Sequence, residues 1–273
     1  MPRVAIQGER GSYSELAASR YFGSAEMMNC TTFTEAFSAV GKGADYAVVP
    51  IENSIEGVVT QVCDLLISGR LHVIGEHILR IEHCLMANEG VAIGDVKTVY
   101  SHPQALAQSR KRLEELGVEM VPFSDTAGAV RMIKERGLRD AAGVAGRYAA
   151  EVYGMKVLMS NLETRSHNYT RFFVLSGEQA SHTGSDSKTA MGFITKNVPG
   201  GLYKALSSFA ENGIDMTYLQ SRPVPRKPWD YGFYVECTGS LEDTKLKEAV
   251  ASLSKNTEEV RILGSYASAR KVF

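Results

Sequence analysis

Hydrophobic positions follow two different patterns along the chain. In the first 177 residues, short apolar runs predict strands at residues 4–7, 45–51, 97–101, 141–145 and 171–175, and residues 71–86 indicate two further extended segments. Apolar residues with helical spacing predict helices between them, at residues 13–22, 58–67, 103–116 and 125–137. Strands that alternate with helices are typical of βαβ units, so this part predicts an α/β fold with mostly parallel sheet. Its length favours two small lobes around a cleft.

The pattern changes at residue 177. Residues 177–187 are small and polar with no apolar period, which predicts a linker. The elements expected after it are a strand, a helix, two strands, a helix and a strand, at residues 189–195, 199–212, 214–222, 230–237, 241–254 and 260–266. This βαββαβ order is the ferredoxin-like arrangement. The sequence therefore predicts one domain at residues 1–177, a linker at 178–187 and a second domain at 188–273.

Composition and charge narrow the class of protein. The chain has 273 residues, of which 44% are hydrophobic and 22% charged, and these values exclude a disordered or collagen-like chain. The 30 basic and 31 acidic residues leave a net charge of −1, so nothing indicates binding to nucleic acid or to an anionic membrane. No apolar run approaches the roughly 20 residues that span a bilayer. The first residues have a strand pattern and not that of a signal peptide, so the expected location is the cytoplasm.

Polar residues gather where predicted strands end and helices begin. Ligands of open α/β sheets bind at the carboxyl ends of strands, and the N–H groups of helix starts bind anions. Hydroxyl and amide side chains at such positions are candidates for substrate contacts: Ser12, Ser14, Asn53, Ser54, Ser101, Gln104 and Thr126. An ordinary role as a helix cap could also explain several of them, Asn53 and Ser54 among them.

A Thr–Arg pair begins the otherwise apolar run at residues 171–175. Arg171 would be costly to bury without a partner, so it needs a carboxylate or a ligand. Strict alternation sends Thr170 and Arg171 to opposite faces of the sheet, and both reach one site only if the strand starts irregularly. No metal-binding spacing and no nucleophile elbow occur, and the four cysteines are irregularly spaced. The pattern favours a site that binds a small polyanion without a metal or another cofactor.

Taken together and in this order, the motifs resemble those of the prephenate dehydratase family, from Val4 to about Tyr266. The residues that carry the resemblance are 8–14, 50–57, 83–85, 101–105, 125–127, 141–155 and 168–175. The βαββαβ region resembles the ACT regulatory domain that follows the catalytic domain in this family. The sequence departs from the family pattern at Gly146, Gly201 and Gln220, where Ser, Ala and Glu are usual. Gln220 bears on the strength of feedback inhibition.

The resemblance implies a fold and an activity. The catalytic domain would have two lobes like a periplasmic binding protein, with the site between them. It would convert prephenate to phenylpyruvate, water and carbon dioxide without a cofactor, in phenylalanine biosynthesis. Thr170 would be the catalytic donor to the leaving hydroxyl. Expected substrate contacts are Ser12, Ser14, Asn53, Ser54, Ser101, Gln104, Thr126, Arg171 and Phe172. Feedback inhibition by L-phenylalanine would involve Gly200, Gly201, Leu202, Asn212, Gln220, Ser221, Arg222 and Pro223.

Three alternatives accompany this interpretation. The same chemistry on arogenate would form L-phenylalanine directly, and the motifs do not separate the two substrates. A non-catalytic sensor of small anions could use the same two-lobed fold. A second, chorismate mutase activity is disfavoured, because no additional helical segment precedes the first strand. ACT domains commonly pair side by side, so a homodimer or homotetramer is expected.

Overall fold

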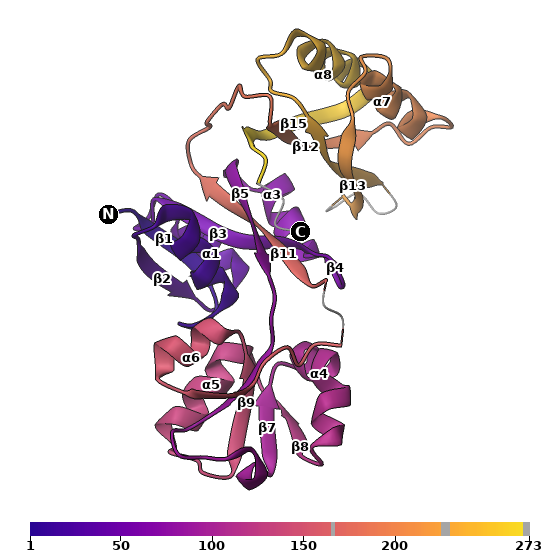
Figure 1. Ribbon diagram of the computed structural model, residues 1–273. Helices are drawn as coiled ribbons and strands as arrows, with labels where there is room; N and C mark the ends of the chain where they lie inside the picture. The colour runs from indigo at the N-terminus through magenta and orange to yellow at the C-terminus, as the bar shows by residue number, and fades with distance from the viewer. Residues whose placement is uncertain (165–166, 225–229, 270–273) are drawn as a thin grey trace.

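The computed structural model describes residues 1–164, 167–224 and 230–269, and its strands form three sheets (Figure 1). The first sheet has the order β2-β1-β3-β11-β5, with β4 paired to β3. Its strands are β1 (Arg3–Gln7), β2 (Glu26–Cys30), β3 (Tyr46–Asn53), β4 (Gly57–Val58), β5 (His72–Arg80) and β11 (Tyr169–Ser176). The helices of this first lobe are α1 (Tyr13–Phe22), α2 (Phe33–Ala39) and α3 (Thr60–Ser68).

The second sheet forms another lobe, in the order β10-β6-β9-β7-β8. Its strands are β6 (Cys84–Ala87), β7 (Thr98–Ser101), β8 (Glu119–Pro122), β9 (Ala141–Ala145) and β10 (Lys156–Met159). Its helices are the short 3₁₀ helix η1 (Ile93–Asp95), α4 (Pro103–Glu115), α5 (Thr126–Glu135) and α6 (Arg147–Tyr153). The chain crosses between the two lobes twice, from β5 to β6 and from β10 to β11 (Figure 1).

The expectation of mostly parallel sheet was wrong. β1 runs parallel to β2 and β3, and β7 runs parallel to β8 and β9. However, β11 is antiparallel to both β3 and β5, and β6 is antiparallel to both β9 and β10. The first lobe is completed by β11, which returns after the chain has formed the second lobe, and local sequence patterns carry no information about that return.

The C-terminal region has the predicted βαββαβ order. Its sheet, β13-β14-β12-β15, is antiparallel throughout. The strands are β12 (Ser187–Thr195), β13 (Met216–Pro223), β14 (Tyr231–Thr238) and β15 (Thr257–Ala267), and the helices are α7 (Gly201–Ala210) and α8 (Thr244–Asn256). This is the ferredoxin-like fold expected of an ACT domain. In the part of the chain that the structure describes, no helix is both long and apolar enough to cross a membrane.

The C-terminal sheet packs against a different partner on each face. On one face the sheet packs against α7 and α8, and the buried cluster between them includes Phe193, Phe209 and Leu253. The other face shares a second cluster with the first lobe, in which Tyr234 and Tyr266 pack with Phe173. At Gly264 of β15, where φ is 150°, an added Cβ would overlap the Val73 carbonyl oxygen of β5. The two regions therefore meet through a common, tightly packed core.

Candidate active site

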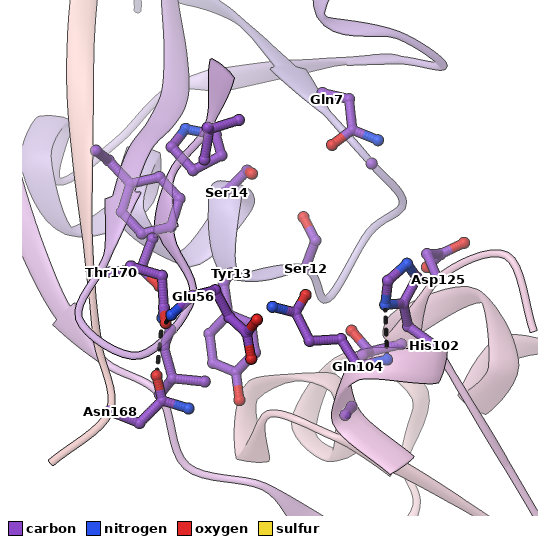
Figure 2. Close-up of a pocket in the computed structure, with 18 of the residues that line it drawn as sticks. Gln7, Ser12, Tyr13, Ser14, Glu56, His102, Gln104, Asp125, Asn168 and Thr170 are labelled. Carbon is purple, nitrogen blue, oxygen red and sulfur yellow. Dashed lines mark hydrogen bonds between the residues drawn. The ribbon is translucent and has the colours of Figure 1, made fainter. Parts of the chain in front are cut away.

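A cleft of about 570 Å³ lies between the two lobes (Figure 2). The starts of four helices reach it: α1 with Ser12 to Ser14, α3 with Val59 to Gln61, α4 with His102, Gln104 and Ala105, and α5 with Asp125 and Thr126. Helix starts carry a partial positive charge and unpaired N–H groups. The cleft therefore favours a negatively charged ligand.

The described side chains that line the cleft add little positive charge to it. Among the described residues that line the cleft there is no lysine or arginine. The ionisable side chains among these described residues are Glu56, His83, His102, Asp125 and the half-buried Tyr13. Burial raises the pKa of the Tyr13 hydroxyl well above its usual range. Among the described residues, helix starts, hydroxyls and amides are therefore the groups that can attract an anion.

Thr170 sits at the first-lobe side of the cleft and accepts a hydrogen bond from Asn53. Asn53 Oδ1 accepts the backbone N–H groups of Ile55 and Glu56, at 2.9 and 3.0 Å. The amide nitrogen must therefore face the other way, and Nδ2 lies 2.9 Å from Thr170 Oγ1. Because Asn53 donates to that oxygen, the hydroxyl proton of Thr170 is left to donate elsewhere.

The amide of Asn53 continues into a longer chain of polar contacts. Asn53 Nδ2 also donates to Asn168 Oδ1 at 2.8 Å, and Asn168 Nδ2 donates to Gln108 Oε1 at 3.0 Å. His83 Nε2 lies 2.8 Å from the same oxygen, which can only accept, so this imidazole carries its proton on Nε2. Burial lowers the pKa of His83, although its hydrogen bond to Gln108 opposes this, so a neutral ring is favoured.

Seven of the ten residues expected at the site line the cleft: Ser12, Ser14, Asn53, Gln104, Thr126, Thr170 and Phe172. Figure 2 shows Thr170 and Asn168 on one side of it and His102, Gln104 and Asp125 on the other. Ser12 is also the N-cap of α1, because its Oγ accepts the Glu15 N–H at 3.3 Å. The expected cap at Asp125 is likewise present, with the Gly128 N–H 2.6 Å from its Oδ1.

Ser54 and Ser101 do not line the cleft, which corrects their expected substrate contacts. Ser101 is fully buried, and its Oγ donates to the Val144 carbonyl at 2.6 Å. Ser54 donates to the His167 carbonyl and accepts the Tyr169 N–H, both at 2.9 Å. Both hydroxyls therefore hold backbone segments together, and each has already donated its only proton.

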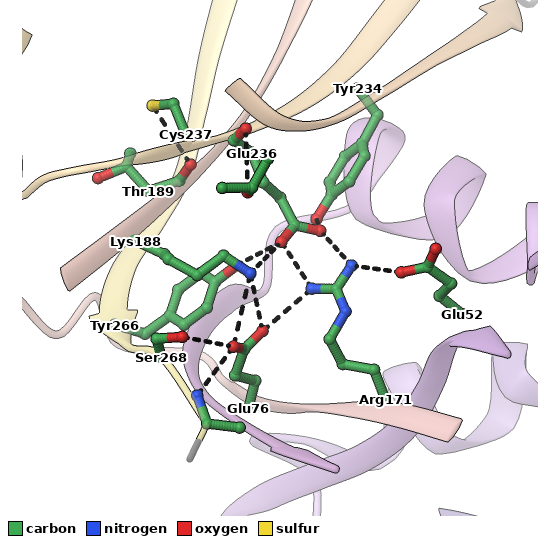
Figure 3. A network of polar contacts seen from close by, with 12 residues as sticks. Glu52, Glu76, Arg171, Lys188, Thr189, Tyr234, Glu236, Cys237, Tyr266 and Ser268 are labelled. Carbon is green, nitrogen blue, oxygen red and sulfur yellow. Dashed lines mark hydrogen bonds and ion pairs between the residues drawn. The ribbon is translucent and has the colours of Figure 1, made fainter. Parts of the chain in front are cut away.

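Arg171 also lies away from the cleft, so its expected substrate contact is corrected. Alternation along β11 places Thr170 on the cleft side, while the Arg171 side chain points toward the C-terminal sheet (Figure 3). Its guanidinium contacts Glu236 at 2.6 and 2.8 Å, and Glu52 and Glu76 at 3.0 Å each. The requirement for a carboxylate partner is thus met within the protein.

The carboxylate of Glu236 is the centre of this network. It is fully buried on β14 and also accepts from Lys188 at 2.8 Å and from the hydroxyls of Tyr234 and Tyr266 at 2.8 and 3.1 Å. Burial alone would raise the pKa of Glu236, but the charges and hydrogen bonds of Arg171 and Lys188 outweigh it and lower the pKa to about 2. The network joins the strand that bears Thr170 to the C-terminal sheet.

The residues of the expected regulatory motifs lie on β13 and at both ends of α7. Gly200 is the N-cap of α7, and a Cβ on Gly201 would overlap the Lys196 carbonyl oxygen, so packing explains the departure from Ala. Asn212 follows the other end of this 10-residue helix, where its Nδ2 donates to the Ser208 carbonyl at 2.8 Å. This helix is about 15 Å long, so Gly200 and Asn212 lie at opposite ends of it within one chain.

The second motif follows the edge strand β13. Ser221 and Pro223 are exposed, whereas Gln220 Nε2 donates to the carbonyl of its neighbour Ser221 at 3.0 Å. Arg222 forms a two-fold contact with Asp64 of α3, with both N–O distances 2.7 Å. Arg222 is therefore used to hold the C-terminal sheet to the first lobe.

The fold and the cleft define an anion-binding protein with two α/β lobes and a ferredoxin-like domain. The sequence profile described as prephenate dehydratase matches residues 4–180. Arogenate dehydratase 2 of Petunia hybrida is 41% identical, over 97% of this chain and 72% of its own length. The chain therefore belongs to the prephenate dehydratase family.

Solved structures agree in fold over nearly the whole chain. The prephenate dehydratase of Arthrobacter aurescens, in complex with L-Phe, is 30% identical with a TM-score of 0.89, covering 97% of this chain and 89% of the other. The structure of GqqA, described as a novel type of quorum quenching acylase, is 36% identical with a TM-score of 0.91, covering 97% and 98%. The C-terminal region is thus shared as well as the catalytic lobes.

Two of the cleft residues that were not among the expected site residues are Gln108 and Asn168. Gln108 and Asn168 connect the polar chain between the lobes, yet neither was singled out for a role. A signal for Gln108 was available: it follows Gln104 by four residues on a predicted helix, so both amides lie on the same face. No comparable local signal marks Asn168, whose partners are 60 and 115 residues away.

Proposed function

We propose that this chain is a lyase that converts prephenate to phenylpyruvate, water and carbon dioxide in phenylalanine biosynthesis. The observation that carries the proposal is the hydrogen bond from Asn53 to Thr170 Oγ1, because it leaves the Thr170 proton free to donate into an anion-binding cleft. The family assignment supplies the substrate class. Division into a catalytic domain at 1–177, a linker at 178–187 and an ACT domain at 188–273 belongs to the same proposal.

The reaction needs placement of the substrate more than strong acid chemistry. The bond to the departing carboxylate breaks, and its electron pair completes the aromatic ring. The ring carbon–oxygen bond breaks, and the leaving hydroxide becomes water with a proton that comes finally from solvent. Thr170 acts as a hydrogen-bond donor to that hydroxyl, since its own acidity is too low for a tuned general acid. Positioning can supply roughly 7–11 kcal/mol in well-oriented systems.

The absence of lysine and arginine among the described residues that line the cleft suits the loss of carbon dioxide. The departing carboxylate must give up its charge as it leaves, and a salt bridge to it would stabilise the ground state more than the transition state. The side-chain carboxylate of the substrate keeps its charge and can be held by helix starts, with Ser12, Ser14, Gln104 and Thr126 as donors. Phe172 supplies an apolar wall, being buried at the base of the cleft.

Arogenate is the second candidate substrate, because the similar plant protein is named for it. Acyl transfer, suggested by the acylase name of GqqA, has less support. A hydroxyl nucleophile needs a base that takes its proton. Asn53 instead donates to Thr170 Oγ1 and so lowers the nucleophilicity of that oxygen.

The test of the function is turnover by the purified protein without added metal or cofactor. We expect phenylpyruvate to form from prephenate, and millimolar L-phenylalanine to lower the rate by about fivefold or more, as in typical allosteric coupling. Arogenate runs in parallel, and its sole turnover would change the substrate while keeping the mechanism. Binding of both compounds without turnover of either would favour a sensor of small anions and contradict the proposal.

Regulation by L-phenylalanine is proposed to accompany assembly of a homodimer or homotetramer. Of the large apolar side chains described as exposed, five lie on the C-terminal region: Val198, Leu202, Tyr203, Leu219 and Tyr231. β13 is also an edge strand of its sheet. Exposed apolar residues beside an open edge support pairing with a second copy.

Light scattering on the purified chain should give a mass at least twice that of the monomer. Tyr203→Glu, which places a charge on the most exposed of these large side chains in α7, should shift the mass toward the monomer. Tyr21→Glu adds the same charge at an exposed site on the first lobe and should leave the mass unchanged. A wild-type protein that stays monomeric at high concentration would refute the assembly.

A further inference from the structure

One hydrogen bond of the polar chain in the cleft joins α4 of the second lobe to the loop between β3 and β4 of the first lobe. Gln108 lies on α4 of the second lobe, and its Nε2 donates to Glu56 Oε1 of the first lobe at 3.1 Å. We call this hydrogen bond the clasp. Glu56 belongs to the loop between β3 and β4, in which Asn53 accepts the Glu56 N–H at 3.0 Å. The clasp therefore ends on the loop that fixes the orientation of Asn53, which donates to Thr170.

The donors and acceptors of the clasp can be arranged in only one way. A carboxylate accepts and cannot donate, so Glu56 turns the Gln108 amide nitrogen toward itself. The Gln108 oxygen then faces the opposite side, where it accepts from Asn168 Nδ2 at 3.0 Å and lies 2.8 Å from His83 Nε2. Both acceptor positions of that oxygen are occupied, and one of the two protons on the amide nitrogen is donated to Glu56.

The orientation set at Gln108 continues to Thr170. Asn168 donates to Gln108, so its oxygen faces Asn53 and accepts the Asn53 Nδ2 at 2.8 Å. The same Nδ2 donates to Thr170 Oγ1 at 2.9 Å. Each amide nitrogen of this polar chain donates toward the next residue in the direction of Glu56. The Asn53 nitrogen also donates to Thr170 Oγ1, which leaves the Thr170 proton free for the cleft.

We propose that Gln108 is a positioning residue, which closes the two lobes through Glu56 and sets Thr170 as a donor. This inference rests on the proposed dehydratase function and deepens it. It assigns Gln108 no substrate contact. The inference predicts that kcat is kept when the hydrogen bond between positions 56 and 108 is present, whichever of the two residues donates. Loss of this hydrogen bond should lower kcat although the residues of the cleft are unchanged.

The Gln108→Glu variant tests this through pH. Two carboxylates would then face each other across the clasp, and each would raise the pKa of the other. At pH 5 a shared proton restores the bond, and we expect kcat close to wild type. At pH 8 the repulsion separates the lobes, and we expect kcat to fall roughly 10- to 100-fold, as for a small misplacement of a catalytic group. Among the described residues, the other titratable groups that face the clasp are His83 and, beside it, Glu163.

A charge-conserving exchange supplies the rescue. In Glu56→Gln/Gln108→Glu the amide and the carboxylate change places, so the bond re-forms in the opposite direction with the same net charge. We expect this double variant to recover kcat at pH 8 to within about threefold of wild type, a difference below 1 kcal/mol. A residue that only contacted substrate, or only supported the fold, would not be rescued by a change at position 56.

Ala107→Glu is the matched control, because it adds the same charge at the adjacent, exposed position of α4. We expect it to keep wild-type kcat at both pH values. If Gln108→Glu keeps wild-type kcat at pH 8, or the double variant stays impaired while its circular dichroism is unchanged, the inference is overturned. An inactive wild-type protein would instead remove the proposed function, so the two failures are distinguishable.

Discussion

Replacing Thr170 with alanine should lower kcat by about 100- to 1,000-fold, the usual loss for one donor to the developing charge of a transition state. Thr170 is buried in β11, and its oxygen accepts from Asn53 at 2.9 Å, so its proton is directed to the ligand. The alanine side chain keeps the backbone pairing of Thr170 with Asn53 and Leu79, and the fold should survive. Steady-state kinetics with prephenate measures the effect.

Thr170→Ser is the control for this prediction. It keeps the hydroxyl and removes only a methyl group, so it should retain most of the wild-type kcat. If Thr170→Ala instead shows near-normal kcat and only a raised KM, Thr170 binds substrate without taking part in the chemical step. The mechanism proposed above would then lose its donor.

Replacing Glu236 with alanine should destabilise the protein by about 3–5 kcal/mol, the usual result of removing one partner from a buried ion pair. The substitution leaves Arg171 and Lys188 buried with only part of their negative partners, and it removes an acceptor from Tyr234 and Tyr266. Urea unfolding followed by circular dichroism measures the loss. Glu242→Ala removes an exposed partner of Lys247 and should change stability by less than about 1 kcal/mol.

The contribution of Glu236 should also depend on pH. Its pKa is lowered from 4.5 to about 2 in the folded protein, so its stabilisation is fully present above pH 4.5 and is lost as pH falls through 2. The shift corresponds to roughly 3 kcal/mol. The stability difference between wild type and Glu236→Gln should therefore shrink over this range. A difference that stays constant from pH 5 to pH 2 would contradict this assignment of the charge.

Local patterns predicted most elements of the fold because hydrogen bonding and apolar spacing within an element are local properties. The helix at α1 and the βαββαβ order of elements along the C-terminal region illustrate this. Several elements were missed, among them β2, α2, β8, α6 and β10, each with at most seven residues. Elements with so few residues contain too few apolar positions for a helical or strand period to be recognised.

For the site, the sequence by itself determined which residue types could meet: hydroxyls, amides and helix starts, with Thr170 and Arg171 on opposite faces of one strand. Only the tertiary structure decided which of them share the cleft. Thr170 meets Asn53 across 117 positions of sequence, and Arg171 meets Glu236 across 65. Ser101 lies in the interior, where its hydroxyl donates to the Val144 carbonyl. Such pairings follow from how the chain crosses twice between lobes, and side-chain periodicity within a strand or helix contains no record of that path.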